Sequence, residues 1–371
     1  MNLLFFGLTL SLLYAVFIFW CLYNWNKNPD RSFDSSSFSG IKVAVIIPAR
    51  NEAERLTNLL EKLIQQDYPS AYLEFIVVDD HSTDDTYKIA ENYFSKENIS
   101  NGRCFHSPGV LKKNAITYGI NKTNAELIIT TDADTLPGKE WVSSIVNAYS
   151  TEKNLLICCP VKLNGNGNYF HKLQGVEFAG LVGIGAASIV AKKPIMCNGA
   201  NMAFSKNIFT EINGYENAKS SSGDDTQLLL KVHGKYPDKI TFLKDARSLV
   251  ATGAIQGCEF FQQRRRWASK IPSTLSMFAV FIAAFAWFVH FVLLFLFIAG
   301  LFKGDLLLII LPLTMKTIPE IIFLKTLEKF FNEKYPVWLI VSAQPLYCLY
   351  ITLVGIILPF GKFKWKGRSL K

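Results

Sequence analysis

The stretch that decides the fold is Lys42–Pro69, KVAVIIPARNEAERLTNLLEKLIQQDYP. It opens with a continuous, largely β-branched apolar run, which is typical of a buried strand, and it turns at Pro48. Asn51 with Glu54 three residues later predicts a cap and a capping-box partner at the start of a helix. One face of that helix would carry the apolar residues Leu56, Leu59, Leu60, Leu63 and Ile64.

The same strand-then-helix pattern recurs twice. LEFIVVDD (73–80) precedes a predicted helix at about 83–93, and AELIITTDADT (125–135) precedes a helix after Lys139. Near-continuous apolar strands that alternate with helices predict an α/β fold whose mostly parallel sheet is covered on both faces. Ligands of such sheets bind beyond the carboxyl ends of the strands.

Acidic residues gather at those strand ends. Asp84 and Asp85 are explained by the start of the next helix, where acids complement the helix dipole and Ser82 or Thr83 can cap. Asp79 and Asp80 lack that explanation, so they are either solvated loop acids or acceptors for the N–H of a nucleobase or the hydroxyl of a ribose.

A second pair, Asp132 and Asp134, flanks the small Ala133, and the two carboxylates can serve one site. Because Mg²⁺ and Mn²⁺ prefer oxygen ligands and are typically held by one or two carboxylates plus substrate phosphates, this pair is a candidate metal site. Lys112 and Lys113 stand at the head of another predicted helix, where they are either an anion site or a solvated pair.

Two further stretches lie closer to the C-terminus. CNGANMAFSK (197–206) is a Gly- and Asn-rich turn that suits a wall against a sugar or acceptor, and SSSGDD leads into a helix with Asp224 and Asp225, for which helix capping is the alternative reading. In FFQQRRRWASK (260–270) the three arginines have a topogenic explanation, because they precede an apolar span. That explanation leaves Gln263 and Trp267 unaccounted for.

The apolar residues are concentrated at the two ends of the chain. Residues 3–23 are uncharged and long enough to span a bilayer, and we expect an uncleaved transmembrane anchor there, because no basic region or cleavage site marks a signal peptide. Lys27 and Arg31 follow this segment, so the middle of the chain is expected in the cytosol. Uncharged spans also occupy 271–302 and 335–360, while the segment between them, with two prolines, Lys316 and Glu320, suits a re-entrant segment as well as a crossing.

These patterns predict four parts: an anchor (1–25), a linker (26–40), a cytosolic domain (41–270) and a membrane region with two to four crossings or re-entrant segments and a basic cytosolic tail (271–371). The net charge of +9 is explained by topogenesis and anionic lipid, so nucleic acid is not an expected partner. The seven cysteines lack the spacing of a metal site and are expected to be reduced thiols.

Taken in order, the motifs PARNE, VVDDHSTDDT, TDAD, GANMAF, GDD and QRRRW resemble those of membrane-bound family-2 glycosyltransferases with the A-type nucleotide-sugar-binding fold. The resemblance covers about residues 41–270. It differs at Asp224, where family members often carry Glu.

The resemblance implies a role for each matching position. Asp225 would be the general base, and Arg266 would stabilise the departing diphosphate. The positions implied to bind the nucleotide-sugar are Pro48, Ala49, Arg50, Glu52, Asp79, Asp80, Lys113, Asp132, Ala133 and Asp134, and Asp134 is the expected direct ligand of Mg²⁺ or Mn²⁺, with Asp132 beside it. Those implied to lie near the acceptor or diphosphate are Gly199, Asn201, Asp224, Gln263 and Trp267.

The implied activity is inverting transfer of a sugar from a UDP-sugar to a lipid or lipid-linked acceptor, or to a glycan, at the cytosolic face of a membrane, which we expect to be a bacterial inner membrane. Three alternatives stay open: a processive polysaccharide synthase of the same family, which the Gln-x-x-Arg-Trp signature favours, a non-catalytic nucleotide-sugar-binding scaffold, and a transporter that uses Lys316 and Glu320.

Overall fold

The computed structural model describes residues 2–31, 40–164, 167–216, 223–255, 257–269, 276–357, 363–365 and 368–370. The chain forms two compact units. The α/β unit comprises Asn28–Asn164 and Met196–Gly253, and the helical unit comprises Met1–Lys27, Gly165–Ile195 and Ala254–Lys371. The predicted cytosolic segment 41–270 therefore contributes residues to both units.

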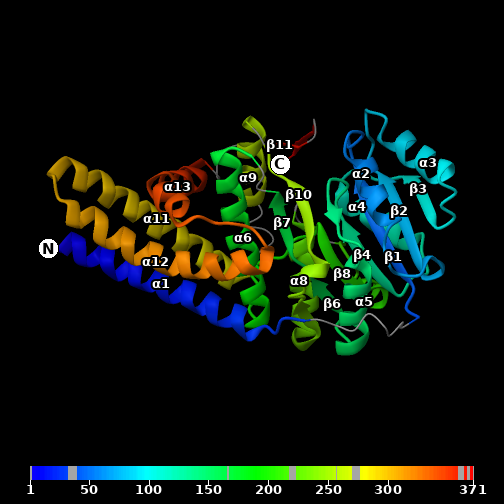
Figure 1. The fold of residues 1–371 in the computed structure, drawn as a ribbon, viewed down its shortest axis with the longest axis horizontal. Helices are drawn as coiled ribbons and strands as arrows, with labels where there is room; N and C mark the ends of the chain where they lie inside the picture. The colour runs from blue at the N-terminus through cyan, green and yellow to red at the C-terminus, as the bar shows by residue number, and fades with distance from the viewer. Residues whose placement is uncertain are drawn as a thin grey trace. The chain divides into compact units, whose positions relative to one another are not determined.

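The α/β unit is built on a seven-stranded sheet with the order β3-β2-β1-β4-β8-β6-β9 (Figure 1). Strands β3, β2, β1 and β4 run parallel, β9 runs parallel to β6, and β8 is antiparallel to both of its neighbours. The predicted mostly parallel sheet is thus confirmed. The strands are β1 (Val43–Ala49), β2 (Leu73–Asp79), β3 (Gly102–His106), β4 (Leu127–Thr131), β6 (Leu156–Cys158), β8 (Asn201–Ser205) and β9 (Ile240–Phe242).

A smaller sheet in the same unit has the order β5-β10-β7. Its strands are β5 (Leu136–Pro137), β10 (Val250–Gly253) and β7 (Val161–Asn164). Strand β5 begins one residue after the acidic turn that follows β4, so β10, its partner, also borders that turn.

Helices connect the strands of the α/β unit. They are α2 (Leu56–Leu63), α3 (Thr86–Lys96), α4 (Lys112–Asn121), α5 (Trp141–Glu152), α7 (Lys206–Glu211) and α8 (Asp224–Lys235), with 3₁₀ turns at Ser70–Tyr72, Pro237–Lys239 and Ala246–Ser248. The predicted apolar face of α2 is buried at its four leucines, but Ile64 lies beyond the helix and is 42% exposed. The predicted cap is wrong, because α2 begins at Leu56 and Asn51 has a positive φ of 50° and bonds elsewhere.

Among the residues that the structure describes, five helices are long and apolar enough to cross a membrane, and all five belong to the helical unit. Four of them are α1 (Asn2–Lys27), α11 (Met277–Lys303), α12 (Leu306–Phe331) and α13 (Val337–Ile357). The segment that was predicted to be either re-entrant or a crossing is the continuous helix α12, which has Pro312 and Pro319 in its interior. The fifth, α6 (Tyr169–Val190), was not anticipated.

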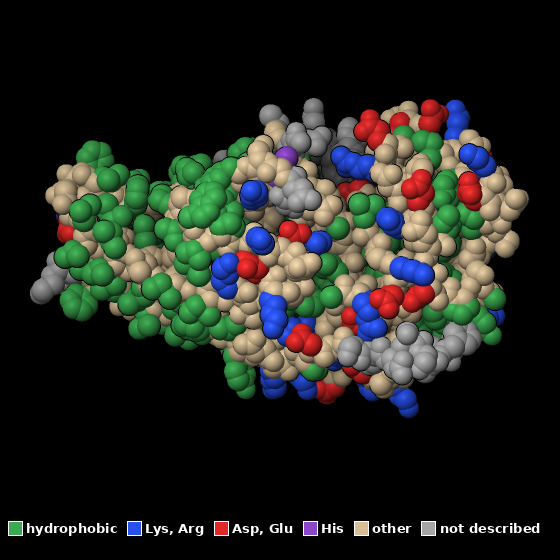
Figure 2. Space-filling model, in the orientation of Figure 1, with side chains coloured by type: hydrophobic (Ala, Val, Ile, Leu, Met, Phe, Trp, Pro, Cys, Tyr) green, Lys and Arg blue, Asp and Glu red, His purple; other side chains and the backbone are tan. Residues whose placement is uncertain are grey.

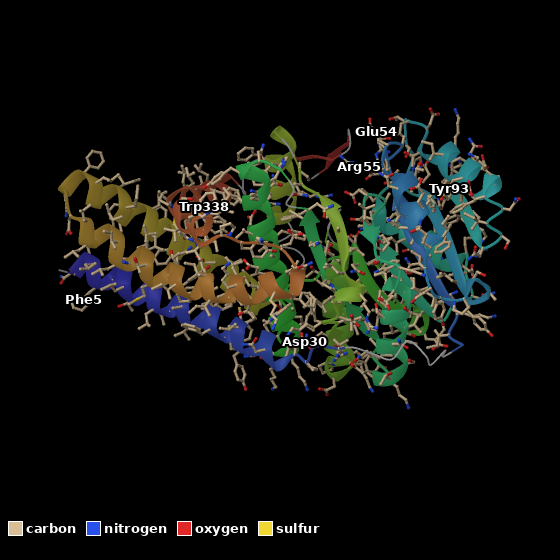
Figure 3. All side chains as sticks on the ribbon, in the orientation of Figure 1. Phe5, Asp30, Glu54, Arg55, Tyr93 and Trp338 are labelled. Carbon is tan, nitrogen blue, oxygen red and sulfur yellow. The ribbon has the colours of Figure 1, made fainter. Side chains whose placement is uncertain are left out.

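The surface of these helices fits a lipid environment. Figure 2 shows hydrophobic side chains over the visible faces of α1, α11 and α12. Phe5 on α1 is 64% exposed and Trp338 on α13 is 61% exposed, and both project from their helices (Figure 3). The unit also contains α9 (Cys258–Ser269) and the antiparallel pair β11 (Phe363–Trp365) and β12 (Arg368–Leu370).

Candidate active site

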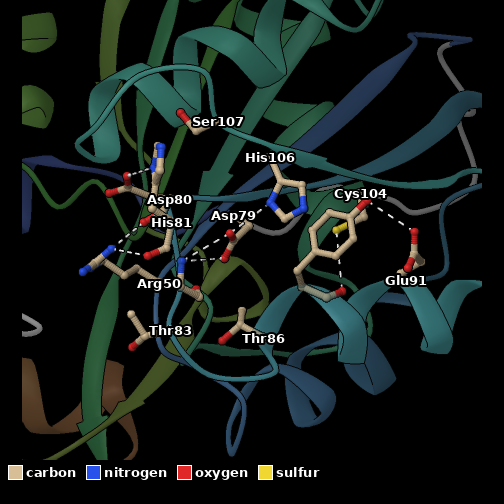
Figure 4. Close-up of polar contacts among 12 residues, drawn as sticks. Arg50, Asp79, Asp80, His81, Thr83, Thr86, Glu91, Cys104, His106 and Ser107 are labelled. Carbon is tan, nitrogen blue, oxygen red and sulfur yellow. Dashed lines mark hydrogen bonds and ion pairs between the residues drawn. The ribbon is translucent and has the colours of Figure 1, made fainter.

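The carboxyl end of β2 holds two buried aspartates with different surroundings (Figure 4). The carboxylate of Asp79, which is 2% exposed, accepts the backbone N–H of Ser82 at 3.3 Å and lies 3.2 Å from Nδ1 of His106. Asp80 is 1% exposed, and its Oδ1 accepts the backbone N–H of Leu111 at 3.2 Å. Asp79 therefore braces the turn after β2, while Asp80 is tied to the loop before α4.

The turn after β1 supports Asp80 from the other side. The amide of Asp80 donates to the carbonyl of Ala49 at 2.7 Å, and Nη1 of Arg50 donates to the carbonyl of Asp80 at 2.8 Å (Figure 4). Asn51 accepts the amide of Thr83 at 2.8 Å, and the amide of Glu52 donates to Oγ1 of Thr86 at 2.8 Å. The first predicted nucleotide-contacting turn is thus joined along its length to the turn after β2.

The acidic turn after β4 is held by its threonines. Oγ1 of Thr135 donates to the carbonyl of Asp132 at 2.8 Å, and the amide of Thr135 donates to the same carbonyl at 3.2 Å. The carboxylate of Asp132 forms an ion pair with Lys112, and that of Asp134 accepts Oγ1 of Thr252 on β10 at 3.2 Å. Both carboxylates are partly exposed, with Ala133 buried between them.

Asp225 connects α8 to the Gly/Asn-rich turn before β8. Its Oδ2 accepts the backbone N–H of Gly199 at 3.1 Å, and its Oδ1 accepts the N–H of Thr226 at 2.7 Å. A Cβ at position 199 would lie 3.1 Å from Cβ of Asp225, so a side chain there would push the carboxylate away. The carbonyl of Gly199 in turn accepts Oγ1 of Thr130, two residues before Asp132.

Asn201, predicted to contact the acceptor or diphosphate, has a different position. Its side chain is fully buried, and its Nδ2 donates to the carbonyls of Pro160 and Ser248, both at 2.7 Å. Its Oδ1 accepts Nε1 of Trp141 at 2.9 Å. Because every polar atom of this amide is used inside the core, that prediction is wrong, and Asn201 instead joins β8 to neighbouring loops.

Lys112 interacts electrostatically with several of the predicted acids. Burial lowers the pKa of Lys112, but the carboxylates of Asp132, Asp225 and Asp224 raise it by more, so the net shift is upward. Burial raises the pKa of the Tyr215 phenol well above its ordinary value, and Asp224 and Asp225 add to that shift. Asp225 is connected to β4 through Gly199, whose amide binds Asp225 and whose carbonyl accepts the hydroxyl of Thr130.

Two consecutive residues therefore join the separate clusters. The amide of Leu111 binds Asp80, and the ammonium of Lys112 pairs with Asp132 and interacts with Asp224 and Asp225. Leu111 has a φ of 94°, a conformation that is uncommon for a residue with a side chain and that is found at functional sites. The resemblance implies that Lys113 lies near the ribose or diphosphate, and the structure shows that its neighbour Lys112 pairs with Asp132.

The other predicted residues, Gln263, Arg266 and Trp267, belong to the helical unit, where all three lie on α9. Arg264, which sequence reasoning did not select, contacts two of them. Its Nη1 donates to Oε1 of Gln263 at 2.7 Å, and its guanidinium lies 4.2 Å from the ring centroid of Trp267.

The carboxylates after β4 could hold a divalent cation that binds together with a substrate. Within the described part of the chain, no group of three or more His, Cys, Asp or Glu side chains forms a ready-made metal cage. Two carboxylates separated by Ala133, both partly open to solvent, match the incomplete ligand set that Mg²⁺ and Mn²⁺ complete with phosphate oxygens and water.

Comparison with known proteins agrees with this geometry. Residues 44–212 match the family model for glycosyl transferase family 2. A dolichyl N-acetyl-α-D-glucosaminyl phosphate glucuronosyltransferase of Methanococcus voltae is 27% identical over 132 residues, which are 36% of this chain and 40% of that protein. A 4,4'-diaponeurosporenoate glycosyltransferase of Staphylococcus aureus is 30% identical over 142 residues, or 36% of each chain.

The chain spans 22% to 40% of the length of the first curated relatives that it matches. Among solved structures, a mannosyltransferase from Pyrobaculum calidifontis in complex with GDP-mannose and Mn²⁺ has a TM-score of 0.61 at 16% identity, over 96% of this chain and 99% of that one. This likeness shows that the two proteins share a fold. Independently of this shared fold, the family match shows that residues 44–212 form a glycosyl transferase family 2 domain.

Proposed function

We propose that the protein is an inverting glycosyltransferase that moves a sugar from a UDP-sugar to a lipid or lipid-linked acceptor at the cytosolic face of a membrane. The observation that supports the proposal is that the consecutive residues Leu111 and Lys112 contact Asp80 and Asp132, which follow two different strands. Acids from separate segments would thereby serve one site at the end of the sheet where α/β proteins bind ligands.

The donor would lie across this end of the sheet. Asp80 would accept hydrogen bonds from the base or ribose, beside the turn formed by Pro48, Ala49, Arg50 and Glu52. Asp79, with its carboxylate bonded inside the fold, would support Asp80. Lys113 follows Lys112 at the start of α4, where helix amides favour an anion such as the diphosphate.

Asp134 and Asp132 would hold Mg²⁺ or Mn²⁺ with the diphosphate of the donor. When bound, the ion would neutralise charge on the departing diphosphate. Binding would also supply a second positive charge near Asp132, which in this structure pairs with Lys112. Metal in the P. calidifontis mannosyltransferase supports this part of the proposal.

Asp225 would be the general base. Two backbone amides fix its carboxylate, which then needs only to lie within hydrogen-bond reach of the acceptor hydroxyl. As the acceptor oxygen attacks the anomeric carbon, its proton would pass to Asp225 and the bond to the diphosphate would break, with Arg266 stabilising the diphosphate. A single displacement inverts the configuration at that carbon.

Two features support a membrane acceptor. The chain has helices long and apolar enough to span a bilayer, and relatives are named for acting on a dolichyl phosphate sugar and on 4,4'-diaponeurosporenoate. The basic residues Lys27 and Arg31 after α1 favour a cytosolic α/β unit. A bacterial inner membrane is the expected location.

A processive polysaccharide synthase is the second candidate. Gln263, Arg266 and Trp267 on α9 form the signature often found in processive members. The length of the product separates the two candidates, because single transfer yields one added sugar and processive transfer yields a ladder.

The test is to incubate the full-length protein in detergent with lipid extract and a panel of UDP- and GDP-sugars, with Mg²⁺ or Mn²⁺. We expect release of UDP from one donor and a lipid product with inverted anomeric configuration, detected by mass spectrometry and NMR. Retention of configuration would exclude the Asp225 mechanism, preference for a GDP-sugar would exclude UDP as the donor nucleotide, and lack of turnover of every donor would count against the activity itself.

A further inference from the structure

The structure contains a polar cluster around the buried Arg264 on α9, formed with the partly exposed Glu177 on α6 and Tyr350 on α13, all within the helical unit. Arg264 is 3% exposed, and its Nη2 lies 2.5 Å from Oε2 of Glu177. Its Nε donates to Oη of Tyr350 at 3.0 Å, and Oη donates to Oε1 of Glu177 at 3.1 Å. The three side chains close a ring of hydrogen bonds between three helices.

Arg264 also contacts the signature residues on its own helix. Its Nη1 donates to Gln263, and its guanidinium stacks 4.2 Å from the ring centroid of Trp267 and 4.5 Å from that of Phe260. The ring of Trp267 also packs near Phe178 of α6, at 6.0 Å between centroids. One guanidinium thus connects Gln263 and Trp267 to helices α6 and α13.

Such a cluster constrains the helix more than apolar packing would. A guanidinium has a planar set of five donors, so its bonds to Glu177, Tyr350 and Gln263 fix the direction of its side chain. In apolar surroundings, breaking one of these bonds leaves a charged or polar partner unsatisfied, so the arrangement resists small rotations of α9.

We propose that Arg264 is a positioning residue for sugar transfer, which acts by anchoring α9 to Glu177 and Tyr350 so that Gln263 and Trp267 are held in the geometry that transfer needs. This inference rests on the proposed function, in which Gln263, Arg266 and Trp267 lie near the diphosphate and acceptor. It adds that α6 and α13, although apolar, contribute the two polar groups that set the orientation of α9.

A second tyrosine supplies a matched control. Tyr14 on α1 donates from Oη to Oε1 of Glu320 at 2.7 Å, just as Tyr350 donates to Glu177. Tyr14→Phe and Tyr350→Phe therefore remove the same hydroxyl from a glutamate of the same helical unit. Only the hydroxyl of Tyr350 also accepts a bond from Arg264.

The experiment compares Arg264→Met, Arg264→Lys, Glu177→Gln and Tyr350→Phe with Tyr14→Phe in full-length protein. The readouts are kcat, KM for donor and acceptor, the Kd for UDP with Mn²⁺, the melting temperature, and hydrogen exchange of the amides of α9. Because a displacement of about 1 Å in a positioning group can lower a rate by roughly 100-fold, we expect kcat to fall about 100-fold in Arg264→Met and about 10-fold in Tyr350→Phe. Arg264→Lys should lie between wild type and Arg264→Met, because Lys keeps the charge and loses the fork.

The Kd for UDP should change much less than kcat, because the proposed contacts to the base and ribose lie in the α/β unit and only the diphosphate would lie near α9. Hydrogen exchange of α9 should accelerate. Tyr14→Phe should lower the melting temperature without changing kcat or α9 exchange. If kcat of Arg264→Met equals that of wild type, or if Tyr14→Phe lowers kcat as much as Tyr350→Phe does, the positioning role is wrong. Should Arg264→Met fail to fold, Glu177→Gln and Tyr350→Phe give the same comparison.

The two proposals fail separately. A wild-type protein that turns over no sugar nucleotide contradicts the proposed function, while α9 exchange still reports whether Arg264 anchors the helix. An active wild type with unaltered Arg264 and Tyr350 variants contradicts only the positioning role.

Discussion

At the carboxyl end of the sheet, the carboxylate of Asp132 pairs with Lys112, and Asp225 and Asp224 raise the pKa of that lysine, whereas in the helical unit one carboxylate, that of Glu320, receives several donors. Nζ of Lys316 lies 2.8 Å from Oε1 of Glu320, and the side chains of Gln344 and Tyr14 donate to the same carboxylate at 3.0 and 2.7 Å.

The contrast teaches how the protein uses buried charge. Asp132 and Asp134, after β4, are partly exposed, so a cation or the N–H groups of a ligand can be accommodated beside them. Around Glu320 the charges balance, and the donors belong to helices α1, α12 and α13. We interpret the first group as a binding site and the second as a structural connection between helices, which makes the transporter alternative unnecessary.

The largest effect is expected at Asp225. Asp225→Asn keeps an oxygen for the amide of Gly199 but cannot take up a proton from an acceptor, so kcat should fall by about 1,000-fold, within the range for loss of a general base. UDP binding with Mn²⁺, measured by calorimetry, should be retained. Asp85→Asn is the control, because that side chain is 69% exposed and pairs with Lys88. Unchanged transfer by Asp225→Asn would remove the base assignment.

The balanced group can be broken from one side. Lys316→Met leaves Glu320 buried without its ammonium, which should cost about 3 kcal/mol in the free energy of unfolding, the lower end for a broken buried ion pair. The double variant Lys316→Met/Glu320→Gln removes both charges and should recover part of that loss. Thermal unfolding in detergent measures both. A double variant less stable than Lys316→Met would contradict the structural interpretation.

The metal pair at the sheet end gives the next effect. Asp134→Asn removes a charged oxygen ligand, so we expect roughly a 100-fold lower kcat/KM at limiting Mn²⁺, of the order seen when a metal site is disturbed. Part of the loss should be regained at high Mn²⁺, and EDTA should abolish transfer by the wild type. Thr252→Val, which removes only the hydroxyl bonded to Asp134, should have a much smaller effect. Full activity of wild type in EDTA would exclude the metal role.

Removing the shared ammonium should make the protein depend more on metal. Lys112→Met leaves Asp132 without its ion pair, and we expect a loss of about 1–2 kcal/mol in unfolding free energy, between the values for exposed and buried pairs. Added Mn²⁺ should then raise the melting temperature of this variant more than that of wild type. Lys88→Met is the control, because that side chain is 76% exposed and pairs with Asp85 outside the proposed site. An equal metal response in the two variants would mean that Lys112 and the cation do not offset the same charge.

The smallest effect concerns a carboxylate outside the site. Asp84 accepts hydrogen bonds from the amide and the hydroxyl of Thr86 at the start of α3. Burial raises the pKa of Asp84, but these bonds lower it by more, so the net pKa lies below its ordinary value of 3.8. A lowered pKa means that the stabilisation is present above about pH 4 and disappears as the pH falls through the folded-state value.

Asp84→Ala should therefore cost about 1 kcal/mol at pH 7, the usual value for a helix-start acceptor, and little at pH 2.5. Urea unfolding at both pH values measures the difference, with Asp85→Ala as the control. An equal cost at both pH values would contradict the role of the ionised form.

Much of this organisation could be predicted from sequence, because strand patterns and turn acids are local signals. The apolar runs of β1, β2 and β4 predicted the parallel sheet. Because ligands bind beyond the carboxyl ends of such strands, the acids after β2 and β4 could be selected as candidate site residues. Which lysine meets the acids depends on where α4 begins. The helix starts at Lys112, as predicted, but nothing local in the sequence signals the uncommon backbone conformation at Leu111 that precedes it.

Tertiary contacts account for the other differences. Asn201 belongs to a Gly- and Asn-rich stretch that is typical of a turn. Strand β8, however, lies between β4 and β6 and carries this side chain into the core. Helix α6 carries Lys172 and Glu177 and many small residues, so its hydropathy is the lowest of the five candidate spans and no uncharged run marked it. The sequence explains Arg264 as a charge that sets membrane topology, because its partners on α6 and α13 are distant in the chain.

The position of β8 in the sheet has a consequence for synthesis. The strand next to β4 comes after helix α6 in the chain, so an emerging polypeptide has made β1 to β4 and then a long apolar helix before residues 201–205 can close the edge of β4. An uncovered strand edge invites pairing with other chains. Correct production of this protein should therefore depend on α6 leaving the ribosome into an environment that shields it quickly, and a fragment that ends before residue 200 should aggregate.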